Sequence, residues 1–220
     1  MKYPDVFGEH ATLDAILSDD ASIARFGDGE FKIVDGKEYV RERRNAQLTA
    51  EIRSVLYNPP VNCMIGIPTM NPLSPKWKGW SPRIPRFVQL LGPCCRVQNF
   101  YSSLITRPDS APWIDTLDFA TKFEDIWRGK RVAVMCEKNG SALRLVRESA
   151  RRCKWIGCPH EGAYALIDDF EDTIAEYMPD VAILSAGVTA TCLAARLTRR
   201  GIQAIDFGSA GSFLLRHLYP

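Results

Sequence analysis

The sequence has little net charge and lacks the long apolar runs that mark membrane proteins. Its 220 residues contain 28 Lys and Arg against 26 Asp and Glu, which leaves a formal net charge of +2. Such a balance provides no general attraction to nucleic acid or to anionic membranes. No apolar run approaches the roughly 20 residues of a membrane-spanning helix, and the start, Met1 to Asp5, lacks the apolar core of a signal peptide. We therefore expect a cytoplasmic protein with no membrane span and no nucleic-acid partner.

The signatures of several enzyme classes are also missing. The chain contains no dinucleotide-binding GxGxxG, no Walker A motif and no GxSxG elbow, and its three histidines have no common spacing. Seven cysteines, an odd number without a CxxC pair, favour reduced thiols over a disulfide framework or a zinc ribbon. Cys63, Cys136 and Cys192 lie in apolar segments, where a thiol packs as a small hydrophobe.

What the sequence does contain is an alternation of apolar strands and amphipathic helices. The alternation is clearest in the second half of the chain, and it implies parallel pairing with right-handed crossovers. We predict one α/β domain over residues 1–220, with a Rossmann-like, mostly parallel sheet and helices on both faces. The expected strands are 22–26, 62–67, 131–136, 153–157, 181–185 and 202–207, and the expected helices are 11–17, 45–57, 113–127, 141–150, 164–177 and 189–200.

The segment 68–93 interrupts this pattern because it is rich in proline, tryptophan and glycine. Long connections inside a compact domain are usually functional loops rather than linkers. We predict a packed loop or lid here, with a short helix near 87–91.

The sharpest local pattern is a pair of carboxylates, Asp28 and Glu30, on a glycine-rich turn after the first expected strand. Gly27 and Gly29 permit tight backbone geometry and close approach of a ligand. The two carboxylates are suited to a shared hard cation such as Mn²⁺ or Mg²⁺, which would neutralise a nucleotide diphosphate, and Arg25 would add positive charge. The alternative is a turn in which Glu30 occupies the first turn of a helix.

Later strand-to-helix turns carry glycine and hydroxyl groups suited to a phosphate. Gly187, Thr189 and Thr191 open the helix after the strand at 181–185, where free N–H groups favour an anion. The alternative is an ordinary N-cap in which Thr189 satisfies free amides. Ser141 stands at the equivalent place after the strand at 131–136. We expect these donor-binding candidates to face one edge of the sheet.

Together these segments resemble the GT-D type glycosyltransferases, a family once catalogued as domain of unknown function 1792. The resemblance begins with the motif Ser22-Ile23-Ala24-Arg25-Phe26-Gly27-Asp28-Gly29-Glu30-Phe31 and continues in family order through 63–68, 126–132, 158–159, 187–191 and 201–208.

The resemblance implies a Rossmann-like fold and the transfer of a sugar, typically glucose, from a UDP-sugar to an acceptor glycan. It implies that Asp28 and Glu30, as the DxE motif, engage a divalent metal and the donor diphosphate. It places Gly187, Thr189 and Thr191 near the nucleotide.

One stretch departs from the family pattern. Residues Gly208 to Phe213 read Gly-Ser-Ala-Gly-Ser-Phe, where the family has Gly-His followed by acidic residues. An inverting transfer needs a general base near the acceptor hydroxyl. Glu137 and Asp206 are candidates by position, and the sequence does not choose between them. The departure also leaves open an alternative function, a non-catalytic nucleotide-sugar-binding module derived from such an enzyme.

Overall fold

The fold is built on one seven-stranded sheet. The computed structural model describes residues 2–43, 45–74, 77–92, 97, 99–107, 110–111 and 114–219. The strands lie in the order β3-β2-β1-β7-β6-β4-β5. Their bounds are β1 Ser22–Arg25, β2 Cys63–Ile67, β3 Phe100–Ser102, β4 Arg131–Cys136, β5 Arg152–Gly157, β6 Val181–Leu184 and β7 Gln203–Asp206.

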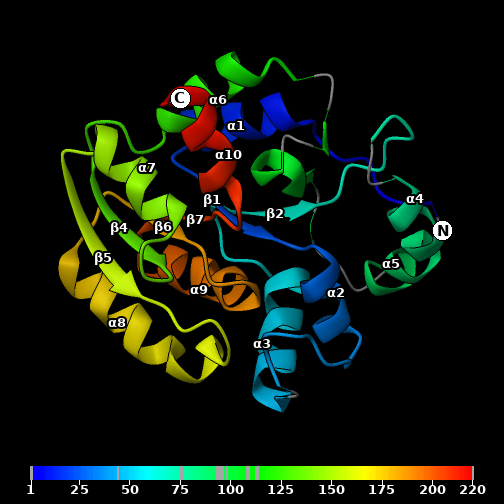
Figure 1. Ribbon diagram of the computed structural model, residues 1–220. Helices are drawn as coiled ribbons and strands as arrows, with labels where there is room; N and C mark the ends of the chain where they lie inside the picture. The colour runs from blue at the N-terminus through cyan, green and yellow to red at the C-terminus, as the bar shows by residue number, and fades with distance from the viewer. Residues whose placement is uncertain are drawn as a thin grey trace.

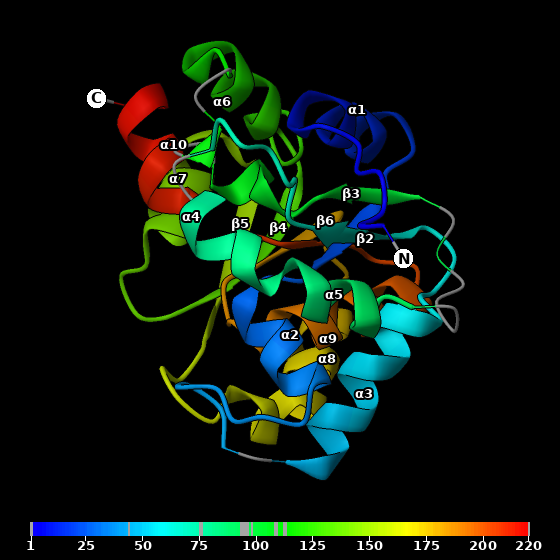
Figure 2. The ribbon, with the colours of Figure 1, turned by 90° about the vertical axis from the view of Figure 1, so that its right-hand side faces the viewer.

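Helices cover both faces of this sheet (Figures 1 and 2). One face carries α2 Asp28–Val34, α3 Ala46–Tyr57, α8 Ile167–Tyr177 and α9 Val188–Arg199. The opposite face carries α1 Glu9–Ser18, α6 Thr116–Glu124, α7 Ser141–Ser149 and α10 Ala210–Leu218. Shorter elements are α4 Trp77–Trp80, α5 Ile84–Leu90 and the 3-10 turns η1 Ser81–Arg83, η2 Ser103–Thr106 and η4 Ala163–Leu166.

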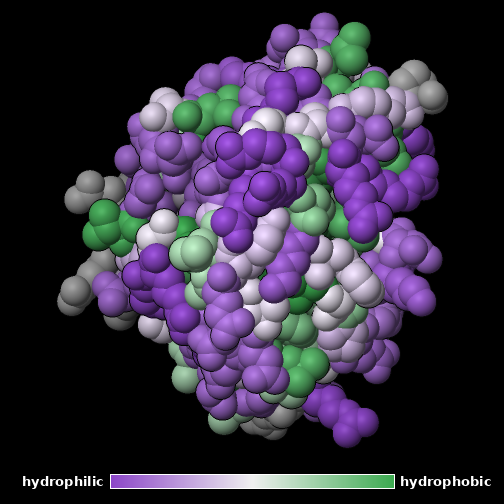
Figure 3. Space-filling model, turned by 90° about the vertical axis from the view of Figure 1, so that its left-hand side faces the viewer, coloured by the Kyte–Doolittle hydropathy of each residue, from purple (hydrophilic) through white to green (hydrophobic). Residues whose placement is uncertain are grey.

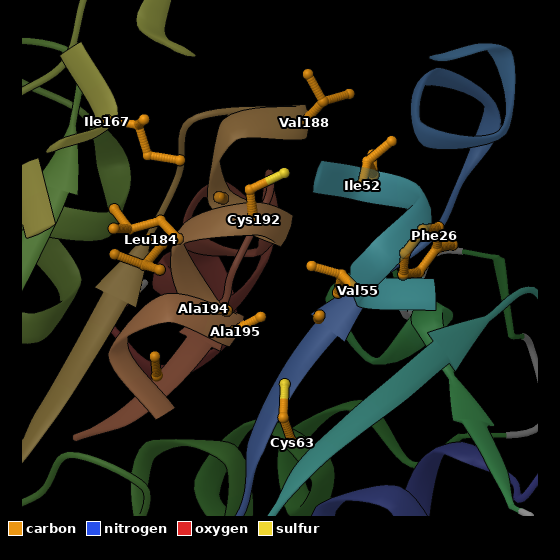
Figure 4. Close-up of a cluster of buried hydrophobic side chains, with 14 of the residues drawn as sticks. Phe26, Ile52, Val55, Cys63, Ile167, Leu184, Val188, Cys192, Ala194 and Ala195 are labelled. Carbon is orange, nitrogen blue, oxygen red and sulfur yellow. The ribbon is translucent and has the colours of Figure 1, made fainter. Parts of the chain in front are cut away.

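Each face of the sheet has its own core. Strand β4 shows why: Ala133 and Met135 belong to one cluster, whereas Val132 and Val134 belong to the other. A strand buried on both faces has a continuous apolar sequence, and residues Val132 to Cys136 form such a run. Figure 4 shows the first cluster, in which residues of α9 and α3 meet the strands. It includes the buried free thiols of Cys63 and Cys192, as the sequence predicted.

The predicted parallel α/β fold is confirmed, because all pairings between the seven strands are parallel. The outermost strand β5 carries Arg152 and Lys154, and charges of this kind protect an exposed edge. Over β5 and α8 the molecular surface is largely hydrophilic, with small apolar patches (Figure 3). In the part of the chain that the structure describes, no helix combines the length and the apolar character needed to cross a membrane.

Several boundaries differ from the prediction for physical reasons. The helix expected over 113–127 begins at Thr116, because the Asp115 side chain caps it by accepting from the amides of Leu117 and Asp118. Trp113 lies outside the described residues. The helix expected from Tyr164 opens with the 3-10 turn η4 and becomes regular at Ile167.

Strand β3 and the helices α4 and α10 were not expected, whereas α2 corresponds to the helical alternative given for the turn at Glu30. The stretch before and within α10 resembles a loop because it is built from small residues. Those residues let α10 approach α7 closely, since a Cβ atom on Gly211 would lie 2.6 Å from the backbone nitrogen of Ala142. Strand β3 is only three residues long, which is too short for a periodic signal.

The proline-rich segment forms short helices beside the sheet rather than an extended loop. Its described residues contain α4, η1 and α5, and the helix predicted near 87–91 is present as Ile84–Leu90. Phe87 is buried and stacks on Phe31 of α2, with ring centroids 4.2 Å apart. The segment is therefore docked onto α2, the helix that carries the DxE motif.

Candidate functional site

The candidate site, which we call the crevice, is the carboxyl edge of the central strands around Arg25 and Asp206, at the ends of β1 and β7. The neighbouring strands β1 and β7 lead into helices on opposite faces, α2 and α10 (Figure 2). Where connections leave a parallel sheet in opposite directions, a ligand crevice opens at the carboxyl edge. Helices α7 and α9 begin at the same edge, after β4 and β6. Their free N–H groups make this edge favourable for an anion.

A buried ion pair between Arg25 and Asp206 forms the centre of the crevice. Arg25 Nη2 lies 2.9 Å from Asp206 Oδ1, and the side chains are 15% and 3% exposed. The guanidinium also donates through Nε to the Asp206 carbonyl at 2.6 Å and through Nη1 to the Ser103 carbonyl at 3.1 Å. Arg25 therefore joins the ends of β1, β3 and β7, and these contacts make it a positioning residue for the crevice.

The turn after β7 needs a glycine to accommodate this arginine. Gly208 has a φ of +51°, and a Cβ atom there would lie 2.2 Å from Arg25 Nη2. Both the backbone conformation and the close approach of the guanidinium therefore favour glycine.

The two threonines near the start of α9, Thr189 and Thr191, are buried, and their hydroxyls have partners inside the protein. Thr191 Oγ1 lies 3.0 Å from Asp206 Oδ2 and 3.1 Å from the Arg25 carbonyl. Thr189 Oγ1 donates to Glu42 Oε1 at 3.0 Å, and Glu42 also accepts from the Tyr164 amide. Both threonines thus fix neighbouring segments, and direct contact with a nucleotide stays a prediction.

The DxE carboxylates lie in the first turn of α2 and point in different directions. Residues two apart on an α-helix are separated by about 200° around its axis. Glu30 turns back, and its Oε2 accepts from the Gly27 amide at 2.8 Å. Burial and then the negative charge of Asp206 raise the pKa of Glu30 to about 7, although Arg25 and the Gly27 amide act against this. The helical alternative for this turn is the one observed.

Asp28 points instead toward the proline-rich segment. Its carboxylate, 40% exposed, forms an ion pair with Arg83 of η1. The pair stands at the edge of a cleft of about 260 Å³ between α2 and α5. Phe31 and Phe87 line this cleft together with Lys32, Arg83 and Arg86, so that positive charge lies beside Asp28.

The residues of the motif fit a divalent cation in part. The described residues contain no group of three or more His, Cys, Asp and Glu side chains arranged to hold a metal. Magnesium, however, is commonly held by one or two carboxylates together with substrate phosphates. Asp28 suits that role because its oxygens are accessible. Binding by Glu30 as well would require its side chain to leave the Gly27 amide.

The remaining predicted donor-binding residues lie at the starts of α2, α7 and α9. The ring of Tyr39 packs against Gly29, and a Cβ atom on Gly29 would lie only 3.0 Å from Tyr39 Cζ. Gly187 has a φ of +56° and opens α9, with nothing within 4 Å of where its Cβ would be. Ser141 Oγ accepts from Ser212 Oγ of α10 at 3.0 Å. Of the group, Gly187 leaves the most open space for a ligand.

A second pair of side chains lies farther along the same edge, after β4 and β5. His160 Nδ1 is 2.7 Å from Glu137 Oε1, and both side chains are about half exposed. They border a small cavity that Ser185 and Gly187 also line. Of the two base candidates predicted by position, Glu137 thus has a histidine partner, whereas both Asp206 oxygens accept hydrogen bonds within the protein.

A large open groove adjoins this cavity. It has a volume of about 1070 Å³ and lies between residues 38–43 and 45–46 on one side and residues 161–162 and 164–165 on the other. Arg41 and Glu42 line both the groove and the cavity. The Gly162 amide donates to the Arg41 carbonyl at 3.0 Å, which ties the two sides of the groove together.

Sequence reasoning missed Glu42, Arg83 and His160. Each lies in a stretch without periodicity, and each gains its place only from a residue distant in sequence. A buried carboxylate such as Glu42, which is 7% exposed, gives no signal in sequence until its partners Thr189 and Tyr164 are known.

Comparison with protein families and sequences gives one consistent picture. A family model described as the glycosyltransferase GT-D fold matches residues 23–212. A probable glycosyl transferase, Gly, of Streptococcus gordonii is 24% identical over 218 residues, which are 91% of this chain and 31% of the relative. The glycosyltransferase GlyD of Streptococcus pneumoniae serotype 4 is 25% identical over 223 residues, 94% of this chain and 27% of that protein. The chain thus spans about three tenths of the length of these relatives.

Solved structures with the same fold agree. A structure described as a new glycosyltransferase (DUF1792) from Streptococcus sanguinis superposes with a TM-score of 0.83 at 25% identity, covering 96% of this chain and 83% of that one. Another, described as the domain of unknown function 1792 with a distinct glycosyltransferase fold, has a TM-score of 0.82 at 23% identity. The match covers 95% of this chain and 79% of that chain.

Proposed function

Since the chain belongs to the GT-D glycosyltransferase family, we propose that it transfers a sugar, a hexose such as glucose, from a UDP-sugar to a hydroxyl of an acceptor glycan. The observation that carries the proposal is the crevice between β1 and β7, with the DxE motif at its rim and the Arg25–Asp206 pair at its centre. The family match over residues 23–212 supports the type of reaction.

The donor diphosphate would lie at the starts of the helices around the crevice. Backbone N–H groups at the N-terminus of the 12-residue helix α9 favour phosphate oxygens. A divalent cation, Mn²⁺ or Mg²⁺, held by Asp28 and the phosphates would stabilise the negative charge of the departing diphosphate. Arg83, the present partner of Asp28, would then move aside or bind a phosphate oxygen itself.

In the reaction, an acceptor hydroxyl oxygen forms a bond to the anomeric carbon of the sugar. The bond from that carbon to the β-phosphate oxygen breaks, and its electron pair leaves with UDP. The hydroxyl proton passes to a general base. The fixed donors of the crevice act on the charge that develops on the leaving group, which is where electrostatic stabilisation is most effective.

A second function is favoured by one specific observation. Residues Gly208 to Phe213 carry no histidine or carboxylate, and the start of α10 is instead packed against α7. A chain that has lost a catalytic group at this point would still bind a nucleotide-sugar without transferring it. The experiment below separates the two functions.

The test is a panel of UDP-sugars with Mn²⁺ or Mg²⁺, in which both UDP binding and sugar release are measured on the wild type and on Asp28→Ala. We expect turnover by the wild type and a loss of about 100-fold in the variant, since charge stabilisation by such a metal contributes several kcal/mol. Asp118→Ala is the matched control, because Asp118 occupies the first turn of α6 away from the crevice.

Three outcomes are distinguishable. Sugar release that depends on Asp28 supports the transferase. Tight UDP binding without release from any donor supports the binding module. A chain that binds no UDP-sugar and no UDP contradicts both functions.

A further inference from the structure

We propose that Glu137 and His160 form the acceptor-activating pair of this site, with His160 as the general base. The inference deepens the proposed function, on which it rests: it names the group that removes the proton from the attacking hydroxyl. It also assigns the adjoining groove, which Tyr39, Arg41 and Glu42 line on one side and Gly162 and Tyr164 on the other, to the acceptor sugar.

The geometry of the pair sets the protonation of the imidazole. Nδ1 of His160 lies 2.7 Å from Oε1 of Glu137. An ionised carboxylate only accepts hydrogen bonds, so the proton of the neutral ring is on Nδ1. Nε2 then carries the free electron pair. A carboxylate that orients a histidine in this way is the arrangement used to activate hydroxyl nucleophiles.

The cavity beside the pair has groups suited to a reacting hydroxyl. It is lined by Ser185 and Gly187, at the end of β6 and the start of α9, together with Arg41 and Glu42. Ser185 Oγ is buried and has no hydrogen-bond partner among the described residues. An unsatisfied buried hydroxyl is costly unless a ligand or water completes its bonding. The cavity has a volume of about 10 Å³, room for one water molecule or one hydroxyl group of a ligand, and such a group would satisfy it.

The groove connects this cavity with the DxE helix. At one side the ring of Tyr39 packs against Gly29, between the two carboxylates of the motif. Arg41 and Glu42 follow along the same segment and line both the groove and the cavity of His160. An acceptor in the groove would therefore lie between the donor-binding helix and the base. Tyrosine, arginine and glutamate side chains supply the aromatic face and the hydrogen bonds that suit a sugar.

The other carboxylates of the crevice are less suited to the role. Asp206 accepts from Arg25 and Thr191 through both of its oxygens, and its side chain is 3% exposed. Glu30 accepts the Gly27 amide and turns into the fold. Among these candidates, His160 and Glu137 are the half-exposed pair.

The hydroxyl proton of the acceptor passes to Nε2 of His160, giving an imidazolium whose charge Glu137 stabilises. The hydroxyl oxygen bonds to the anomeric carbon, and UDP leaves with the electron pair of the broken bond. The imidazolium returns its proton to solvent after the product leaves.

The experiment compares the wild type with His160→Gln and Glu137→Gln, using UDP-glucose as donor and water or p-nitrophenyl β-glycosides as acceptors. The turnover number is measured from about pH 5 to 9, and UDP affinity is measured in parallel. His217→Gln is the matched control, because His217 packs against Phe213 on α10. Thermal unfolding of each variant verifies folding, which the exposed position of both side chains should preserve.

We expect His160→Gln to lower turnover by about 10²- to 10⁴-fold, the usual contribution of general-base catalysis, with UDP affinity within about twofold. The wild-type rate should fall on the acidic side as the base gains a proton, and His160→Gln should lose that limb. Glu137→Gln should also lower turnover, because the imidazole loses the carboxylate that orients it. Among the described residues, the other charged groups that line the cavity or groove beside the pair are Glu38, Arg41, Glu42, Arg43 and Glu161.

A folded His160→Gln variant with wild-type turnover overturns this inference and leaves the proposed function intact. Reduced turnover with an unchanged acidic limb also overturns it, since His160 would then act only through structure. A wild type that releases sugar from no donor overturns the proposed function and this inference together.

Discussion

Arg25 and Asp206, which are 181 residues apart in sequence, form the buried ion pair at the centre of the crevice. Their closest charged atoms are 2.9 Å apart, and the arginine also reaches the carbonyls of Asp206 and Ser103. The pair therefore does more than neutralise charge. It fixes the ends of three strands relative to the DxE helix that follows β1.

Replacement of Arg25 by lysine tests this relationship. Lysine retains the charge but lacks the planar fork that reaches several acceptors at once. Leaving Asp206 buried with an incomplete partner should lower the free energy of unfolding by about 3 kcal/mol. Chemical denaturation measures the change. Arg151→Lys, at the exposed pair with Asp180, is the control and should change stability by less than about 0.5 kcal/mol. Equal effects in the two variants would contradict the structural role.

The ion pair between Asp28 and Arg83 predicts competition between the proline-rich segment and a metal. If Asp28 holds a cation, Arg83→Ala should lower the Mn²⁺ concentration needed for half-maximal turnover by roughly two- to fivefold, the range expected for loss of a partly exposed pair. A metal titration of sugar release measures it.

Arg86→Ala is the matched control for that titration. Arg86 lines the same cleft but pairs with Asp35, so its removal takes away a similar positive charge without freeing Asp28. A metal requirement that changes equally in both variants, or in neither, would argue against competition at Asp28.

Asp35 at the end of α2 predicts a pH dependence of stability. Arg86 first and then Lys37 lower its pKa from 3.8 to about 2. A carboxylate with a lowered folded pKa stabilises the protein above its unfolded pKa and loses that contribution as the pH falls toward the folded value. Asp35→Asn should therefore cost about 1 kcal/mol at pH 7, given the exposure of both cations. The difference from wild type should shrink between about pH 4 and pH 2.

Urea unfolding at several pH values measures this difference. The control removes the partner: in an Arg86→Gln background, Asp35→Asn should have a smaller effect with a flatter pH dependence. A difference that grows as the pH falls would have the wrong sign for an ion pair.

Local sequence was sufficient for the elements that repeat a simple pattern. The run at 131–136 and the amphipathic stretch at 189–200 were assigned correctly because strands buried on both faces and helices with one buried face leave clear periodicity. The motif around Asp28 and Glu30 was recognisable for the same reason: it is contiguous. Helix α10 was missed because the small residues at its start, Ala210, Gly211 and Ser212, resemble a loop. Their use is to permit close contact with α7, and that contact is not visible in the sequence of α10 itself.

The sequence by itself determined the parallel α/β fold, the family and the segments that meet at the carboxyl edge, since all of these follow from patterns within single segments. Only the tertiary structure decided what each polar group faces. It directed Glu30 inward, paired Asp28 with Arg83, buried Thr189 and Thr191, and placed His160 beside Glu137. Ion pairs and hydrogen bonds depend on distances of about 3 Å between residues far apart in the chain, and only the folded backbone sets those distances.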